Sequence, residues 1–455
     1  MTELILLIKI ILGRKKKYLI ASPAWYGYGE MFESLFLAVN LASYYGKRLV
    51  LTYATVHLRK NTTLPAICNH ELKTFEVYGM GRVGDPDSVI SKLLSVYLNL
   101  SRRYNMTIPG KVARKMSGER LLRNRIGFWG HGEKKGLPKM LGLNEPVNWK
   151  HVLRNPIQIN LTPEQEERGR KGLRELGIPD GKPFVCLYVR DNGFVKKHSI
   201  INIAKFYASD IHTYARAVKT VMDDGYHVIR MGDSTAVPID IGGDFINYAH
   251  CPHQTDLMDL YLYRHCEFMM STGGGARFAS IFYNRPTIVT NWIAINMSGY
   301  CIGQQDMFIV KHIFSAEKKR LLSLREQLEL IDVDTDRWCH FYPDRYIYVD
   351  NTEQEIDQVI KEWLEANRNP RFNWNHQLQE EYHHLKIKHA RKKSKKYRKQ
   401  TGKIYSTDKY LHFRPKIGNE FIENCWEYGP YLKSLTEQFL GRHKDTDIQY
   451  SSYYD

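Results

Sequence analysis

Short apolar segments alternate with amphipathic segments through the middle of the chain. Between residues 183 and 292, each apolar run is only a few residues long and ends in polar or glycine residues. This rhythm is typical of a parallel α/β sheet whose strands are separated by helices. It predicts strands at 184–190, 226–231, 245–249, 267–271 and 286–290, and helices at 203–224, 255–265 and 274–283.

Capping residues mark two helix starts around this region. Thr162 precedes Pro163, and Gln165 follows three residues after Thr162, which is the pattern of an N-cap with a capping box. Residues 351–355 predict a second capped helix, which runs to near Ala366 after a strand at 346–349.

The first part of the chain predicts a strand, a helix and a second strand, which is a βαβ unit. These elements are expected at Tyr18–Ser22, Glu30–Tyr45 and Lys47–Thr52. A further helix is expected at 88–104, and residues 105–150 are interpreted as loops and short helices that face a cleft. A chain of 455 residues is too long for one ordinary core. We therefore divide it into domains at 1–155 and 156–370 and a basic helical extension at 371–455, which is expected to pack back on the first domain.

The formal net charge of +17 favours anionic partners. Ten of the Lys and Arg residues lie between Lys386 and Lys403, a stretch without Asp or Glu. Two interpretations stay open, a solvated basic helix and a surface that binds anionic lipid or another polyanion. The seven scattered cysteines contain no CxxC pair, so neither a disulfide framework nor a metal site is expected, and a reducing cytoplasm fits best.

The apolar N-terminal segment, Leu4–Leu12, is too short to span a bilayer and is followed by the basic run Arg14–Lys17. A secretion signal has the opposite order of charge and apolar run. The segment is either an anchor that lies on the inner face of the membrane or a buried first helix.

Polar groups follow the predicted core strands where ligands of open α/β sheets bind, outside the carboxyl ends. Arg190 suits a diphosphate, either as a ligand contact or as one that stabilises the departing charge, and the alternative is an ion pair with Asp191 that holds the loop. Arg230, Gly232 and Asp233 repeat this arrangement on the next strand.

The glycine-rich turn Ser271–Gly275 lies between a strand and a helix. Glycines there let a phosphate approach the backbone N–H groups, and three in a row exceed what a plain strand–helix turn requires. The predicted donor-binding residues are Arg190, Arg230, Gly232, Asp233, Asp256, Ser271, Thr272, Gly273, Gly274 and Gly275. Asp256 is also explained by its position at a helix start.

A sugar transfer that inverts the anomeric centre needs a general base. The carboxylates Glu30 and Asp191 and the imidazole His131 are candidates, so the predicted catalytic residues are Arg190, Asp191, Glu30 and His131.

Several of these blocks together resemble a sequence-defined family of bacterial glycosyltransferases associated with surface-polysaccharide loci. The matching segments are CLYVRDNGF, GYHVIRMGD, TDLMDLYL, STGGGARFASIFYNRPTIVTNW, NTEQEIDQVIKEW and RPKIGNEFIENCW. The resemblance implies a GT-B fold of two Rossmann-like α/β domains facing a cleft, followed here by a basic, mostly helical C-terminal extension. It also implies metal-independent transfer, with the donor in the second domain and the acceptor on the side of the first.

The predicted function is therefore a cytoplasmic glycosyltransferase, peripheral on the inner face of the membrane. It would move a sugar from a nucleotide-sugar to a surface-polysaccharide or lipid-linked glycan acceptor, without a cofactor. The alternatives are a nucleotide-sugar epimerase or hydrolase on the same scaffold and a basic nucleic-acid-binding protein. Nucleic acid is the less favoured partner because the basic run is local and no recognised binding module is visible.

Overall fold

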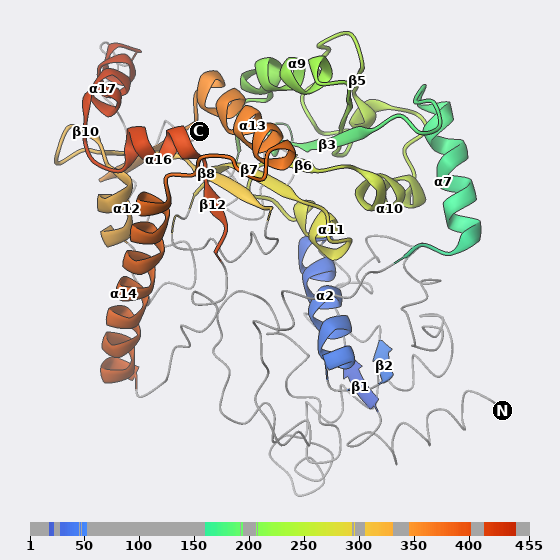
Figure 1. Cartoon of the computed structure of the whole chain (residues 1–455), viewed down its shortest axis with the longest axis horizontal. Coiled ribbons are helices and arrows are strands. Elements are labelled where there is room, and N and C mark those ends of the chain that lie inside the picture. The colour runs from blue at the N-terminus through green and yellow to red at the C-terminus, as the bar shows by residue number, and fades with distance from the viewer. Residues whose placement is uncertain are drawn as a thin grey trace, which may run out of the picture. The chain divides into compact units, whose positions relative to one another are not determined.

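The structure is a computed structural model of the whole chain (Figure 1). It describes residues 18–21, 28–44, 46, 48–51, 160–191, 193, 206, 208–293, 295, 305–330, 345–401 and 414–442. The chain divides into two compact units. The first comprises residues 1–172, 255–264 and 278–284, and the second comprises residues 173–254, 265–277 and 285–455.

A seven-stranded parallel sheet forms the centre of the second unit, and its strand order is β12-β8-β7-β6-β3-β4-β5. The strands are β3 (Phe184–Tyr188), β4 (His227–Arg230), β5 (Phe245–Ile246), β6 (Met269–Ser271), β7 (Thr287–Trp292), β8 (Met307–Val310) and β12 (Lys416–Ile417). The five strands predicted between residues 184 and 290 are all confirmed, and the chain is a mainly parallel α/β protein.

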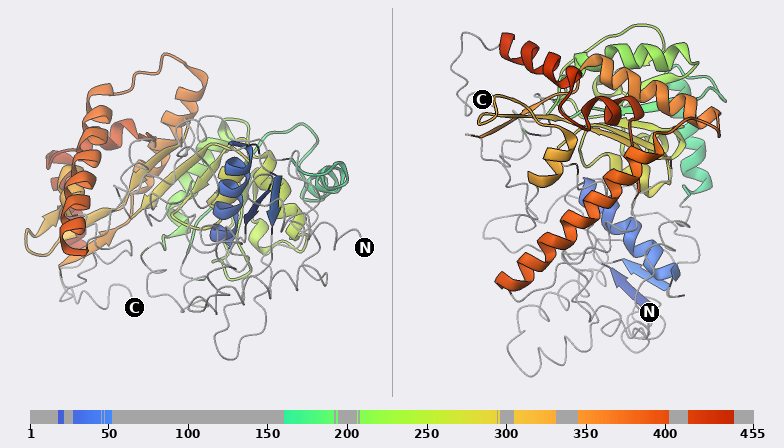
Figure 2. Two further views of the ribbon diagram at one scale, coloured as in Figure 1. Left: turned by 90° about the horizontal axis from the view of Figure 1, so that it is seen from below. Right: turned by 60° about the vertical axis from the view of Figure 1, so that its left-hand side comes forward.

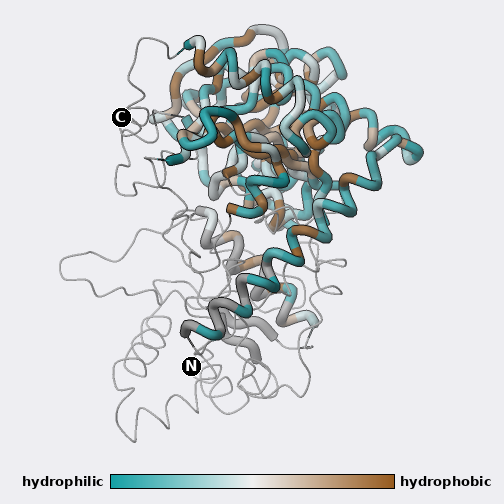
Figure 3. Tube along the Cα trace, turned by 90° about the vertical axis from the view of Figure 1, so that its left-hand side faces the viewer, coloured by the Kyte–Doolittle hydropathy of each residue, from teal (hydrophilic) through white to brown (hydrophobic). Residues whose placement is uncertain are grey.

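The strands are almost continuously apolar because a parallel sheet is covered on both faces. Val185, Cys186 and Leu187 are fully buried in β3, and every residue of β6 and β7 is buried. Hydrophobic residues accordingly gather in the interior of the traced chain in Figure 3. Helices α9 (Ala215–Asp223) and α13 (Glu353–Arg368) lie side by side over one face of this sheet (Figure 1).

Local capping explains where several helices begin. Helix α7 (Pro163–Glu175) follows the predicted capping box, in which the Gln165 N–H donates to Thr162 Oγ1 at 3.2 Å and the Thr162 N–H donates to Gln165 Oε1 at 3.0 Å. Helix α13 begins after Thr352 with a capping box completed by Glu355, also as predicted.

The helix predicted at 203–224 is shorter than expected among the described residues. Asp210 caps a 3₁₀ turn, η3 (Ile211–Tyr214), which leads into α9. The helix predicted at 274–283 is likewise only α11 (Arg277–Phe282), because the glycines before it stay outside the helix. The strand predicted at 245–249 ends early, at Ile246, and a second 3₁₀ turn, η4 (Tyr248–His250), follows it.

A second, antiparallel sheet was not foreseen. It pairs β9 (His312–Ser315) with β10 (Arg320–Leu321) and with β11 (Tyr346–Val349). The predicted strand at 346–349 is confirmed, but it joins this small sheet and not the parallel one. Helix α12 (Leu324–Leu330) follows β10.

The last part of the chain is integrated into the second unit. Strand β12 pairs with β8, and α16 (Asn419–Cys425) packs against α13. Two further helices, α14 (His376–Thr401) and α17 (Pro430–Arg442), belong to this part of the chain, and the expectation of a separate basic helical extension stays a prediction. The long helix α14 leads away from the sheet (Figure 2) and is mostly hydrophilic (Figure 3). The domain boundaries at 155 and 370 stay predictions.

In the first unit, β1 (Tyr18–Ala21), α2 (Tyr28–Tyr44) and β2 (Arg48–Leu51) form the predicted βαβ unit, with β1 and β2 parallel. Phe32 of α2 packs edge-on against Phe282 of α11, which belongs to the same unit, at 5.2 Å between ring centroids. Residues 88–150 lie outside the described residues. Within the described part of the chain, no helix combines the length and the apolar character that a bilayer crossing needs.

Candidate functional site

The strand order places a topological switch point between β3 and β6. From β3 the chain moves outward to β4 and β5 on one side, and then returns to form β6, β7 and β8 on the other side. In register, Tyr188 of β3 pairs with Ser271 of β6, and Leu187 pairs with Arg230 of β4. The carboxyl ends of these three neighbouring strands therefore meet at one edge, and in open α/β sheets ligands bind in the crevice at such a point.

The Arg190 loop and the glycine-rich turn are joined directly across this switch point. The Arg190 backbone N–H donates to Thr272 Oγ1 at 3.0 Å, and the Thr272 N–H donates to the Tyr188 carbonyl at 3.0 Å. The Ser271 hydroxyl is fully buried and donates to the Thr272 carbonyl at 2.7 Å. Arg190 itself is half-buried, so its side chain is the more accessible group at this junction.

Asp191 forms the centre of a buried network that ties two strand ends together. One carboxylate oxygen accepts hydrogen bonds from Arg230 Nη2 at 2.6 Å and from the Val237 N–H at 2.7 Å, and the other accepts from the Gly193 N–H at 3.0 Å. The Asp191 side chain is 3% exposed and that of Arg230 is fully buried. Arg230 also donates to the Val237 carbonyl.

This network assigns the two charges a structural task. Burial lowers the pKa of Arg230, and the adjacent Asp191 opposes that shift. An ion pair between Asp191 and Arg190 was one interpretation of the sequence. In the structure, Asp191 pairs with Arg230 on the next strand. A carboxylate with three hydrogen bonds and almost no exposure holds loops in place, and it is poorly placed to take a proton from an acceptor hydroxyl.

The loop after β4 is held by short-range polar contacts. Gly232 has a φ of 146°, a conformation that residues with a side chain rarely adopt. Its carbonyl accepts a hydrogen bond from Gln254 Nε2 at 2.6 Å. Asp233 is exposed and accepts from the Thr235 N–H at 2.8 Å, which makes a turn within the loop.

The glycine-rich turn has a packing role as well as an open backbone. A Cβ atom at Gly274 would lie 2.6 Å from Cε1 of Tyr188, so a glycine lets the turn approach β3 closely. Arg277 follows the turn, is 2% exposed, and lies over the Trp292 ring at 4.6 Å from its centroid. The sequence blocks contain Arg277 but it was not among the predicted site residues. An arginine immediately after the glycines was the available signal.

The remaining predicted residues lie in the first unit. Asp256 is in the first turn of α10 (Asp256–His265), and Thr255 Oγ1 accepts from the Met258 N–H at 3.1 Å as the cap of that helix. Glu30 is in the first turn of α2, and His131 lies outside the described residues. Their place relative to the Arg190 edge stays a prediction.

Lys311 is a second buried charge near this edge, and it was not predicted from the sequence. Lys311 follows the end of β8, and its Nζ donates to the Ala208 carbonyl at 2.6 Å and pairs with Asp350 Oδ1 at 2.5 Å. The next residue of the loop, Ser209, donates its N–H to the Arg190 carbonyl at 2.8 Å. Lys311 thus holds the Ala208–Ser209 segment beside Arg190. A lysine inside the apolar run MFIVKHIF was the only hint in the sequence.

Comparison with known proteins leaves the family of this chain open. A scan against protein-family models finds no match, and a search of curated proteins finds none either. Among solved structures, the chain is similar to E. coli ADP-heptose lps heptosyltransferase II, with 13% identity, 60% of this chain and 84% of that chain covered, and a TM-score of 0.34. It is also similar to a glycosyl transferase family 9 protein from Veillonella parvula DSM 2008, with 8% identity, 60% and 80% coverage, and a TM-score of 0.33. Similarity of this strength does not decide the family or the activity.

Proposed function

We propose that this protein is a glycosyltransferase that transfers a sugar from a nucleotide-sugar donor to a surface-polysaccharide or lipid-linked glycan acceptor. One observation carries the proposal: Arg190 and the Ser271–Gly275 turn are joined by a 3.0 Å hydrogen bond at the switch point between β3 and β6. The sequence blocks CLYVRDNGF and STGGGAR, which resemble glycosyltransferases, occupy the two sides of this point.

The leaving group of the transfer is a nucleoside diphosphate, whose negative charge grows as the glycosidic bond breaks. A positively charged donor fixed in advance lowers the energy of that charge. Arg190 is the half-buried cation at the switch point, whereas Arg230 is fully buried against Asp191. Helix α11 has only six residues, so its dipole adds little. We therefore assign the diphosphate to Arg190 and to the backbone N–H groups of the glycines, and no catalytic metal is required.

The acceptor hydroxyl must lose its proton to a base. Because Asp191 is held by three hydrogen bonds in a buried network, we place the base in the first unit, with Glu30 and His131 as the candidates. The buried carboxylate then orients the loop that carries Arg190. The protein is proposed to work in the cytoplasm, with the basic face of α14 against an anionic membrane surface.

Donor binding and turnover test the proposal in sequence. Nucleotide-sugars are screened for thermal stabilisation of the full chain, since a ligand that binds the folded state raises the melting temperature. The stabilising donor is then incubated with glycan acceptors. Arg190→Ala should lower transfer by roughly 10²-fold or more, as loss of one charge-stabilising donor does. The exposed Arg371→Ala is the matched control and should leave transfer unchanged.

Three results would contradict the assignment. Full transfer by a folded Arg190→Ala variant removes Arg190 from the chemistry. Conversion of the donor to its epimer, or to free sugar without an acceptor, supports the epimerase or hydrolase alternative. Tight binding of duplex or single-stranded nucleic acid without any nucleotide-sugar response supports the nucleic-acid-binding alternative.

A further inference from the structure

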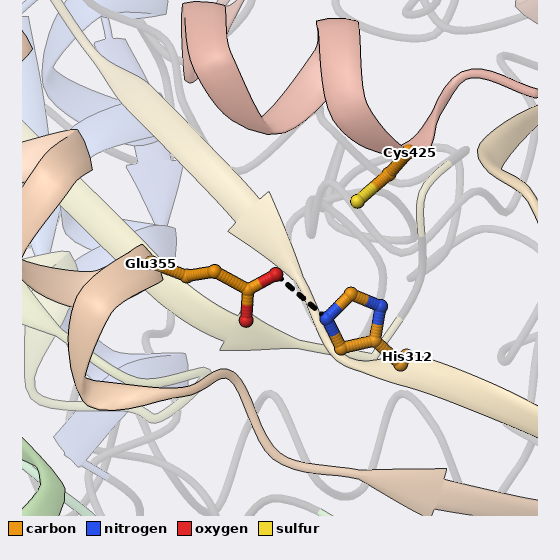
Figure 4. Close-up of side chains that lie close together, drawn as sticks. All are labelled: His312, Glu355 and Cys425. Atoms are coloured by element: carbon orange, nitrogen blue, oxygen red, sulfur yellow. Dashed lines mark hydrogen bonds and ion pairs between the residues drawn. The ribbon is translucent and has the colours of Figure 1, made fainter. Parts of the chain in front are cut away.

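Three side chains that can ligate a metal ion meet in the interior of the second unit (Figure 4). They are His312 from β9, Glu355 from α13 and Cys425 from α16. One potential ligand atom of each lies within 4.8 Å of those of the other two. His312 and Cys425 are each 1% exposed and Glu355 is 7% exposed.

The cluster is only partly satisfied by hydrogen bonds. Glu355 Oε1 accepts from His312 Nε2 at 2.8 Å, and Glu355 Oε2 accepts from the Thr352 N–H at 2.8 Å and from Thr352 Oγ1 at 3.2 Å. The Tyr431 side chain also hydrogen-bonds to the Glu355 carboxylate. His312 Nδ1, in contrast, has no hydrogen-bond partner among the residues that the structure describes. A buried polar nitrogen without a partner is uncommon and indicates either a cost in stability or an absent ligand.

Nitrogen, oxygen and sulfur together select a particular class of ion. Imidazole and thiolate are ligands of zinc-like transition metals, whereas magnesium and calcium prefer oxygen alone. We propose that His312, Glu355 and Cys425 bind one divalent ion of the zinc class, which fastens β9, α13 and α16 to one another. On binding, the Cys425 thiol loses its proton to solvent and forms a sulfur–metal bond. The ring proton of His312 moves from Nε2 to the unpartnered Nδ1, so that Nε2 and a Glu355 oxygen bind the metal. A fourth coordination position would be left to water.

The ion would be structural and separate from sugar transfer, which is proposed to need no catalytic metal. Its place in the fold gives it a local effect. His312 directly follows Lys311, whose Nζ donates to the Ala208 carbonyl, and Glu355 belongs to the capping box of α13. Sequence spacing could not reveal this cluster, because its three members lie far apart along the chain and converge only through the packing of the last helices.

Metal binding by the full chain tests the proposal without any assay of transfer. The purified protein is treated with a chelator, and zinc affinity is measured by competition with a chromophoric chelator. We expect one equivalent to bind, and Cys425→Ser and Glu355→Gln to weaken binding by at least about 10²-fold, given that loss of even an outer-shell partner costs 10–100-fold. Cys266→Ser, a buried cysteine outside the cluster, is the control and should bind zinc as the parent does.

Cobalt substitution supplies a second measurement, and its spectrum in the parent chain does not depend on the folding of a variant. Cobalt bound to the parent chain should show thiolate-to-metal charge-transfer absorption, and this absorption should be lost in Cys425→Ser and kept in Cys266→Ser. The proposal is overturned if zinc does not bind, if cobalt binds without this absorption, or if Cys425→Ser binds both metals like the parent. The cluster would then be a buried ion pair only.

Discussion

Replacing Asp191 by Asn tests the buried network at the switch point most directly. The substitution keeps the size of the side chain but removes its charge. Arg230, which is fully buried, would then keep a positive charge without a counterion, and the amide group would face the Val237 N–H with at most one acceptor oxygen. Breaking a buried ion pair by removing one partner typically costs about 3–5 kcal/mol.

The expected loss is worked out from the contacts of this one carboxylate. Among the described residues, three hydrogen bonds converge on it, so the charge term and the unsatisfied groups belong to one network and should not be added separately. We therefore expect about 3–5 kcal/mol in total. Because each 1.4 kcal/mol is a factor of ten, amide exchange in β3 and β4 should accelerate between about 10²- and 10⁴-fold if it proceeds by opening of this unit.

Hydrogen exchange followed by mass spectrometry of peptides from residues 184–237 measures this change. Asp233→Asn is the matched control, since Asp233 is exposed and its carboxylate accepts from the Thr235 N–H within the same turn. It should accelerate exchange less than about tenfold. Equal protection in the two variants would show that the Asp191–Arg230 pair does not hold these strands, and Asp191 would return as a candidate base.

Three further predictions follow from particular contacts. Gly274→Ala should lower the free energy of unfolding by about 1–3 kcal/mol through overpacking against Tyr188, and it should weaken nucleotide binding in calorimetry. The control Gly429→Ala should change neither, because a Cβ there meets nothing within 4 Å. Unaltered nucleotide affinity in Gly274→Ala would show that the turn serves only as a structural connection. Burial, and then the charges of Lys386, Arg414 and Lys416, lower the pKa of His383 to about 2, so the unfolded chain takes up a proton below pH 6.5 that the folded chain cannot accept. Stability should therefore fall by about 2 kcal/mol from pH 7 to pH 5 through this group, and urea unfolding of His383→Gln should lack that component; an identical pH profile would contradict the assignment. The exposed basic residues of α14 should recruit the protein to anionic but not to neutral vesicles at low salt. A variant in which Lys388, Lys392, Lys395 and Lys399 are replaced by Glu should not sediment with the anionic vesicles. Equal, negligible sedimentation of the parent protein with both vesicle types would assign the basic face to another partner.

The basic segment shows how burial alters an interpretation made from composition. Lys386 opens the run of ten cations in the sequence, but in the structure it is 1% exposed and its Nζ lies 5.1 Å from the Tyr382 ring centroid. Lys388, Lys392, Lys395 and Lys399 are exposed, and their spacing of three and four residues places them along one face of α14. Composition predicted the charge, and the helix decides which part of it can meet a partner.

Local sequence signals were enough to predict most of the elements around the switch point. Alternating apolar runs predicted the strands from β3 to β7, and two capping boxes, Thr162–Gln165 and Thr352–Glu355, predicted two helix starts. Both kinds of signal act over a few neighbouring residues, so the sequence carries them directly. It also placed Arg190, Arg230 and Ser271 correctly at strand ends.

How those strand ends combine became visible in the three-dimensional fold and not before. The strand order makes β3 and β6 neighbours across the switch point. Asp191 pairs with Arg230 on the next strand, and β11 joins an antiparallel sheet. The fold also brings His312, Glu355 and Cys425 together from three elements. Such contacts depend on which surfaces can be buried against one another at long sequence separation. Local periodicity along the chain does not predict those pairings.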